Sequence, residues 1–195
     1  GSMHLILSGI TATLPVAGFL FSVTQTVGAF SLLAGCKYVL FGLPITLWLP
    51  TLFATLSWAV SSAPTKQVNT YFDFMLHVFL PLSCFALFVT HPEGSHAFLY
   101  ACYWFIPSAA WILRTRSNNH VFIIGLQSTF VAHAAGSIMW LYTVPMTAAQ
   151  WNVLIPLVAI ERLTIAGCSA LFAYGLQYVK HVTAPTTTSF RAVRG

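Results

Sequence analysis

Long apolar runs separated by short polar clusters fill most of this chain. Five runs are clear, and each is about as long as the roughly 20 helical residues that cross a bilayer. Residues 5–60 are apolar nearly throughout, which is too long for one helix and enough for two. The pattern predicts an all-α, polytopic transmembrane helical bundle of about six helices, at about 5–23, 38–60, 70–90, 96–113, 120–143 and 153–179.

A single transmembrane domain over residues 3–180 accounts for nearly the whole chain. Gly1 and Ser2 stand before the first Met and are interpreted as a tag remnant. Residues 181–195 are polar and rich in Thr, so we expect them to form a flexible cytoplasmic tail.

Polar residues interrupt the first apolar stretch at "SVTQTVGAF" and again at Lys37. We expect residues 24–37 to form a re-entrant or surface-lying connection between the first two helices. Backbone that is not helical at membrane depth must line a cavity or be buried in protein. This connection is therefore a candidate lid over a site.

The composition agrees with a membrane protein, because 57% of the residues are hydrophobic and only 6% are charged. Soluble domains carry about 25% charged residues. The chain has eight Lys and Arg residues against three acidic ones, but they are scattered rather than gathered in dense basic patches. A nucleic-acid partner is therefore not expected. The expected partner is the lipid bilayer.

The basic residues predict the orientation, because Lys and Arg in short loops stay on the cytoplasmic side. With six helices, only Lys37 falls on the side away from the N-terminus. Both termini are therefore expected to be cytoplasmic in a multi-pass protein of the cell (inner) membrane. The residues that fall on the N-terminal side are Lys66, Arg114, Arg116, Lys180, Arg191 and Arg194.

Two charges stand inside the last apolar run, where "LVAIERLTIAG" places Glu161 beside Arg162. A charge at the bilayer centre costs about 2.5–3.5 kcal/mol on insertion scales. Adjacent helical side chains point about 100° apart, so we expect each of the two to have a partner elsewhere. One interpretation is that they link the last helix to two neighbours. The other is a solute site in which Arg162 receives a carboxylate or phosphate.

The helix at 120–143 carries a polar stripe, since Thr129, His133, Ser137 and Trp140 recur at helical spacing. Counting from the outer ends of the two helices places His133 at the depth of the charged pair. A shared depth is what a buried site requires, and a purely structural polar network would show it as well. The solute interpretation puts one polar pocket between the last two helices, open to the outside, with Trp140 or Trp104 stacking on the solute.

Asp73 and His77 stand at i and i+4 near the cytoplasmic start of the helix at 70–90. They can share a proton or a hydrogen bond, which suits a gating or coupling role. An interfacial cap with its neighbour is the alternative.

Seven histidines raise the question of haem. If His77 faces His120 and His91 faces His133, the layout is similar to the two-haem bundle of b-type cytochromes, with haem b as cofactor. The turn "HPEGSH" holds His91, Glu93 and His96, which are metal-ligating by type but lack a further ligand at defined spacing. We interpret them as solvated loop residues, and no metal site is predicted.

Enzymatic chemistry finds little support in the sequence, because it contains no HExxH, paired Asp or GxSxG pattern. No catalytic residue is assigned.

The overall layout resembles the substrate-binding (S) component of energy-coupling-factor vitamin transporters. The features that carry this resemblance are six helices, both termini inside, a first connection that covers an outward-facing pocket, and the Pro-rich segment "GLPITLWLPTLFATLSWAV" at 42–60. Ser8 and Ala12 have the small-residue spacing through which that family docks its transmembrane partner. The resemblance implies a separate energising membrane and ATPase complex as a partner.

The leading interpretation is a membrane protein that binds a small polar or amphipathic solute, vitamin-like or a metabolite, and takes it up from the outer side. Two alternatives stay open at this point: a haem-binding electron-transfer subunit, and a structural subunit of a larger membrane complex.

Overall fold

The computed structural model describes residues 15, 16, 25, 28, 49–62, 70–114 and 120–183, and they are helical nearly throughout, with no strand among them. The helices are α3 (Leu49–Ser62), α4 (Thr70–Phe74), α5 (Leu80–Thr90), α6 (Pro92–Ser95), α7 (Phe98–Ala101), α8 (Phe105–Arg114), α9 (His120–Thr143) and α10 (Ala148–Thr183), with a π-helical turn, η3 (Met75–Phe79), and a 3₁₀ turn, η4 (Cys102–Trp104).

Three helical segments in this part of the chain are long and apolar enough to cross a membrane: Thr70–Thr90, Val121–Thr143 and Ala148–Val182. The part of the chain that the structure describes is therefore all-helical, and its three long apolar helices are those of a membrane protein. The count of six spans and the side on which the termini lie remain predictions.

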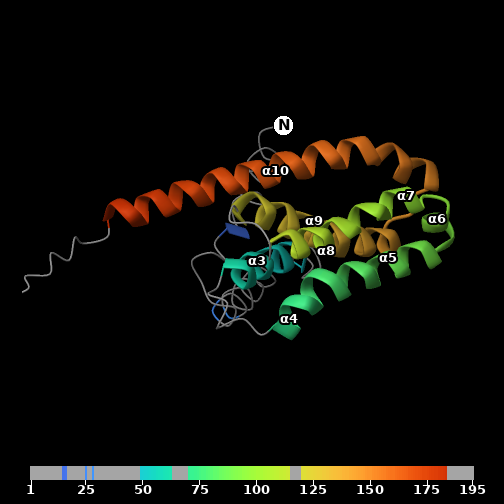
Figure 1. Ribbon diagram of the computed structural model, residues 1–195. Helices are drawn as coiled ribbons and strands as arrows, with labels where there is room; N and C mark the ends of the chain where they lie inside the picture. The colour runs from blue at the N-terminus through green and yellow to red at the C-terminus, as the bar shows by residue number, and fades with distance from the viewer. Residues whose placement is uncertain are drawn as a thin grey trace, which may run out of the picture.

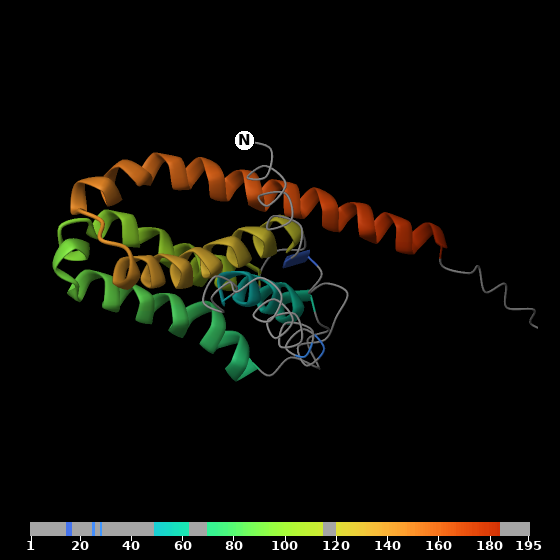
Figure 2. The same cartoon turned by 180° about the vertical axis from the view of Figure 1, so that it is seen from behind.

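Helix α9 is the centre of the bundle, where it packs against α3, α5, α8 and α10 (Figure 1). Within its membrane-spanning window 61% of the residues are buried, against 22% for α10. Helix α10 lies along one side of the bundle, and its C-terminal part extends beyond the other helices, as both views show (Figures 1 and 2). A site that is enclosed by protein is therefore expected against α9 rather than on α10 alone.

Close contact between α9 and its neighbours depends on two glycines. A Cβ at Gly125 would lie 2.9 Å from the carbonyl oxygen of Ala166 on α10, which is closer than real Cβ atoms come. A Cβ at Gly136 would lie 3.3 Å from Cγ of Pro50 on α3. Small residues at these crossings let the helix backbones approach one another.

The helical path from α4 through η3 to α5 stays continuous across a proline. Pro81 has no N–H to donate to the carbonyl of His77, four residues earlier. Ser108 Oγ on α8 donates to that carbonyl instead, at 3.2 Å, and the N–H of Leu80 bonds to Met75 in the π-helical pattern. In a membrane such freed backbone groups must find a partner, and here a neighbouring helix supplies it.

Several predicted boundaries hold and others shift. The helix predicted at 120–143 has those limits, and 70–90 is helical throughout. The helix predicted at 96–113 runs from 98 to 114 and contains the 3₁₀ turn. The described part of 38–60 ends two residues later than predicted, at Ser62. The helix at 5–23 lies outside the described residues apart from 15 and 16, and of the candidate lid at 24–37 only 25 and 28 are described.

The prediction that the last helix spans 153–179 was wrong at both ends, because it runs from 148 to 183 and takes in the start of the expected tail. Its N-terminus is a capping box. The N–H of Thr147 donates to Gln150 Oε1 at 2.8 Å, and the N–H of Gln150 donates to Thr147 Oγ1 at 3.4 Å. Residues 148–152, which precede the predicted start at 153, therefore form the first turn of α10.

Candidate functional site

A cavity of about 480 Å³ lies between α9 and α10, with further contributions from α7 and from Pro50 on α3. Its volume falls within the range of about 300–1,000 Å³ that is typical of small-molecule sites. The polar and aromatic side chains that line it are Tyr100, His133, Ser137, Trp140, Trp151, Glu161 and Arg162, and the remaining lining is mostly apolar. We refer to this space as the α9–α10 cavity.

Five of the seven solute-binding candidates chosen from the sequence line the α9–α10 cavity: Arg162, Glu161, His133, Ser137 and Trp140. Thr129 lies next to it, where Oγ1 accepts a hydrogen bond from Arg162 Nη1 at 3.4 Å. Trp104 does not line it. That side chain is completely buried and packs edge-on against Phe88, with ring centroids 5.2 Å apart, so stacking of Trp104 on a solute was a wrong expectation.

Glu161 and Arg162 were each expected to have a partner elsewhere, but they also contact one another. Glu161 Oε1 lies 2.9 Å from Arg162 Nη2, because both side chains are long enough to bridge the angle between adjacent helical positions. Arg162 also has the predicted partner elsewhere, Thr129. The Glu161 side chain is 50% exposed and that of Arg162 is 19% exposed, so the pair stands at the edge of the cavity with its cation on the inner side.

Three buried polar atoms from cavity residues lack a hydrogen-bond partner among the residues that the structure describes. They are His133 Nε2, Trp151 Nε1 and Arg162 Nε. The His133 and Trp151 residues are only 8% and 2% exposed. An unsatisfied buried donor or acceptor costs about 1–3 kcal/mol. A molecule in the cavity with matching polar groups would recover that free energy.

Tyr100 and Trp151 complete the aromatic wall, and the sequence analysis missed both as site residues. The Tyr100 ring lies 5.3 Å from that of His133 and 4.9 Å from that of Trp151, and its hydroxyl is 3.0 Å from Ser137 Oγ. Trp151 is buried in the core, only 2% exposed. The Thr-x-x-Gln capping signal at 147–150 was available in the sequence and would have moved Trp151 into the helix.

A second polar cluster joins α3, α4, η3 and α8 around Asp73. Asp73 Oδ1 lies 2.7 Å from His77 Nδ1, while its Oδ2 accepts hydrogen bonds from Trp111 Nε1 at 2.8 Å and from Arg114 Nη2 at 2.5 Å. The other ring nitrogen of His77, Nε2, lies 2.8 Å from Ser57 Oγ. Asp73 and His77 are therefore in the contact that was predicted, but they are buried in the bundle and do not form an interfacial cap.

The order Asp73, His77, Ser57 has the hydrogen-bond sequence of a Ser–His–Asp relay. In the neutral ring, an Nδ1–H that donates to Asp73 leaves Nε2 to accept a hydrogen bond from the Ser57 hydroxyl. Ser57 is nevertheless completely buried and does not line the α9–α10 cavity, so no substrate position is defined beside it. What the geometry supports is a buried cross-link between helices, with a titratable ring at its centre.

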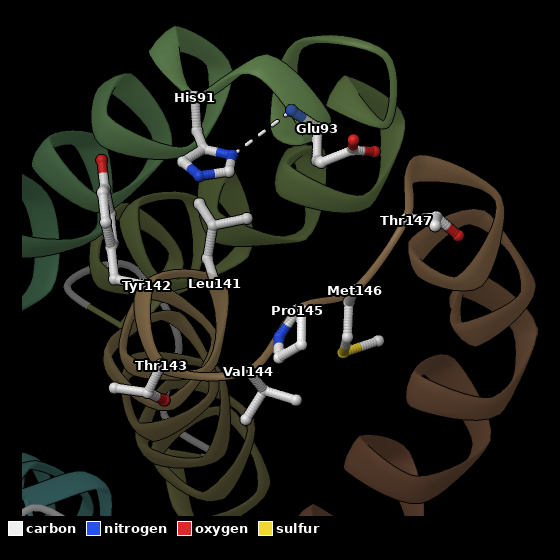
Figure 3. Close-up of a pocket in the computed structure, with 9 residues that line it drawn as sticks. All are labelled: His91, Glu93, Leu141, Tyr142, Thr143, Val144, Pro145, Met146 and Thr147. Atoms are coloured by element: carbon white, nitrogen blue, oxygen red, sulfur yellow. Dashed lines mark hydrogen bonds between the residues drawn. The ribbon is translucent and has the colours of Figure 1, made fainter.

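A second cavity, of about 460 Å³, lies at the connection between α9 and α10 (Figure 3). His91 and Glu93 lie on one side of it and residues 141–147 on the other. Glu93 Oε2 accepts a hydrogen bond from the N–H of Ala148 at 2.7 Å, so its negative charge stands at the N-terminus of α10, where the helix dipole favours it. Met146 lines this cavity and the α9–α10 cavity alike, and therefore stands between them.

The histidines considered as haem ligands have separate surroundings. Both ring nitrogens of His77 are in hydrogen bonds, with Asp73 and with Ser57. His91 packs edge-on against Tyr142, while His133 lines the α9–α10 cavity. The side chain of His120 lies outside the described part of the chain.

His91, Glu93 and His96 do not form a metal-binding group. Within the described ranges no three His, Cys, Asp or Glu side chains are grouped closely enough to hold a metal ion. Glu93 instead caps α10, and His91 Nδ1 accepts a hydrogen bond from the N–H of Glu93 at 3.3 Å.

No protein-family model matches this chain, and neither does any curated protein or solved structure.

Proposed function

We propose that this protein binds a small polar or amphipathic solute in the α9–α10 cavity and takes it up from the outer side of the inner membrane. The observation that carries the proposal is the convergence of Arg162, His133 and Trp151 on one cavity, each with a buried polar atom that lacks a partner among the described residues. Polar groups of this kind are costly inside a bilayer, and they commonly mark solute pathways.

The second cavity supports an entry route from the end of the bundle where α9 and α10 are connected. Among the described residues, Met146 is the one that lines both cavities, so a solute passing from one to the other would pass this side chain. In the orientation predicted from the loop charges, this end of the bundle faces outward.

In this proposal the Asp73–His77 cluster has the gating or coupling role. Through Asp73 it holds α4 and η3 to α8, and through the His77–Ser57 contact it holds them to α3. A change in protonation or position of Asp73 would therefore affect the packing of α4 and η3 against both α8 and α3. The sequence carries no nucleotide-binding motif, and the resemblance to energy-coupling-factor S components favours energy supplied by a separate membrane and ATPase complex.

Mass spectrometry of small molecules released from the purified protein tests the proposal. We expect a ligand that copurifies with the native protein and is lost from Arg162→Ala, while Thr164→Ala retains it. Thr164 is a matched control because it is exposed on α10, outside the cavity lining, and its hydroxyl donates to the Ile160 carbonyl of its own helix. Native protein from which no solute is ever released or bound would contradict the proposal.

Haem binding is the second candidate, and the unpartnered His133 Nε2 is the observation that favours it. A haem bound by two histidines would need another ring beside His133, whereas His77 would have to give up a hydrogen bond first. The absorbance spectrum of protein expressed with haem available distinguishes the two, because a Soret band that is lost in His133→Ala would favour haem.

A further inference from the structure

We infer that the solute of the α9–α10 cavity is an organic monocarboxylate with an apolar body. Before the solute binds, Glu161 occupies the position on Arg162 that the solute carboxylate takes. This inference rests on the proposed function and names the chemistry of its ligand.

The balance of hydrogen-bond donors and acceptors in the cavity favours a ligand that accepts hydrogen bonds. An Arg guanidinium and a Trp indole N–H only donate hydrogen bonds. Arg162 Nε and Trp151 Nε1 are both buried and lack a partner among the described residues. The one carboxylate in the lining is Glu161. A ligand that complements these groups must therefore present oxygen acceptors, and beside a cation it gains most when those oxygens carry negative charge.

Glu161 contacts Arg162 in a way that leaves room for a second carboxylate. Nε and Nη2 form one edge of the guanidinium, the edge that pairs with both oxygens of a carboxylate in a bidentate contact. Glu161 reaches only Nη2, and Nε stays unpaired. Because the Glu161 side chain is half exposed, its contact with Arg162 is weak and readily exchanged. A ligand carboxylate can take both nitrogens while Glu161 turns outward.

The charge of the cavity lining favours a carboxylate over a phosphate. Among the described residues that line the cavity, Arg162 is the only Arg or Lys. One guanidinium balances one negative charge, whereas a dianionic phosphate would leave a second charge uncompensated beside an apolar wall. The cavity therefore favours a monoanion.

The remaining lining specifies the rest of the ligand. Trp140 and Trp151 offer flat apolar faces, and Leu154 and Leu157 continue the wall along α10. Trp140 on α9 and Leu157 on α10 are 53% and 59% exposed, so the cavity borders the outer surface of both helices as well as the interior. An aromatic carboxylate from solution and a fatty acid from the bilayer share the required chemistry.

Binding of four probes to the purified full-length protein tests the inference. They are 3-phenylpropionate, its neutral amide, phenyl phosphate and dodecanoate, and the dissociation constants are measured by calorimetry in lipid nanodiscs. We expect at least one carboxylate to bind about tenfold or more tightly than the amide and the phosphate, as a charge-assisted bidentate contact predicts. Tighter binding of 3-phenylpropionate assigns a soluble source, and tighter binding of dodecanoate assigns the bilayer.

Two variants test the exchange at Arg162. Glu161→Gln removes the competing carboxylate, so carboxylate affinity should rise several-fold. Arg162→Lys keeps the charge but loses the bidentate edge, so affinity should fall. Because Glu161 is half exposed, Glu161→Gln is expected to fold even if the Arg162 variant does not.

The possible outcomes separate this inference from the proposed function. If the amide binds as tightly as the carboxylate, or Glu161→Gln lowers carboxylate affinity, the inference is overturned while solute binding stands. If no probe binds, the ligand released from the native protein decides: a carboxylic acid supports the inference and any other compound overturns it. If no probe binds and the native protein releases no ligand, the proposed function itself is contradicted.

Discussion

The Asp73 carboxylate holds the His77 ring at 2.7 Å while its second oxygen accepts hydrogen bonds from Arg114 and Trp111. One acidic side chain thus satisfies three donors from two different helical segments. Because the Asp73 and Arg114 side chains are only 10% and 12% exposed, water cannot readily replace either partner. Removing one charge leaves the other poorly compensated.

Asp73→Asn should therefore destabilise the protein by about 3 kcal/mol or more, because it leaves the partly buried Arg114 guanidinium without its counter-ion. Thermal unfolding in detergent measures the loss. The double variant Asp73→Asn with Arg114→Met removes both charges and should recover part of it. Equal unfolding temperatures for the single variant and the native protein would show that the ion pair contributes little.

Ser108→Ala should cost about 1 kcal/mol, because it removes the donor that satisfies the His77 carbonyl opposite Pro81. Pro81→Ala restores an N–H in the helix that can reach this carbonyl. In the Pro81→Ala background the cost of Ser108→Ala should therefore be smaller. A double-mutant cycle of unfolding free energies measures the coupling, and additive effects would argue against this account of the π-helical turn.

Gly125→Ala should destabilise the contact between α9 and α10 by about 1–3 kcal/mol, because the added Cβ meets the carbonyl oxygen of Ala166 at 2.9 Å. Gly167→Ala is the matched control, since nothing that the structure describes lies within 4 Å of a Cβ at that position. The control should be neutral or slightly stabilising, because Ala favours a helix over Gly by about 1 kcal/mol. Equal unfolding temperatures for the two variants would contradict the close approach of these helices.

Features that depend on spacing within one helix could be predicted from the sequence. The limits of α9 agree with the prediction, because the length of the apolar run and the fixed rise per residue set them. His133 does share a cavity with Glu161 and Arg162, but the count that placed them at one depth began at residue 153, and the last helix begins at 148. The limits of a helix depend only on its own sequence. Predicting them needs no knowledge of which faces pack together.

Features that depend on contact between helices could not be predicted in this way. Ser57 had no local sign that it would face His77, twenty residues away. Trp104 and Trp151 are both apolar aromatics in apolar runs, yet only Trp151 lines the α9–α10 cavity. Rotation of each helix about its axis decides such differences, and packing sets that rotation. The Glu161–Arg162 contact was missed for another reason. Long side chains can bend across the angle that helical geometry sets between their Cβ atoms.

Met146→Trp should slow solute exchange without a comparable change in affinity, because Met146 stands between the second cavity and the α9–α10 cavity. A larger side chain there obstructs entry and exit alike, so association and dissociation rates of the carboxylate probe should fall together, by about tenfold. Stopped-flow measurement of the change in total tryptophan fluorescence on probe binding follows both rates. Val153→Trp is the control, since Val153 is exposed and lines neither cavity. If Met146→Trp instead weakens binding at an unchanged association rate, Met146 is a wall of the site and the solute enters by another way.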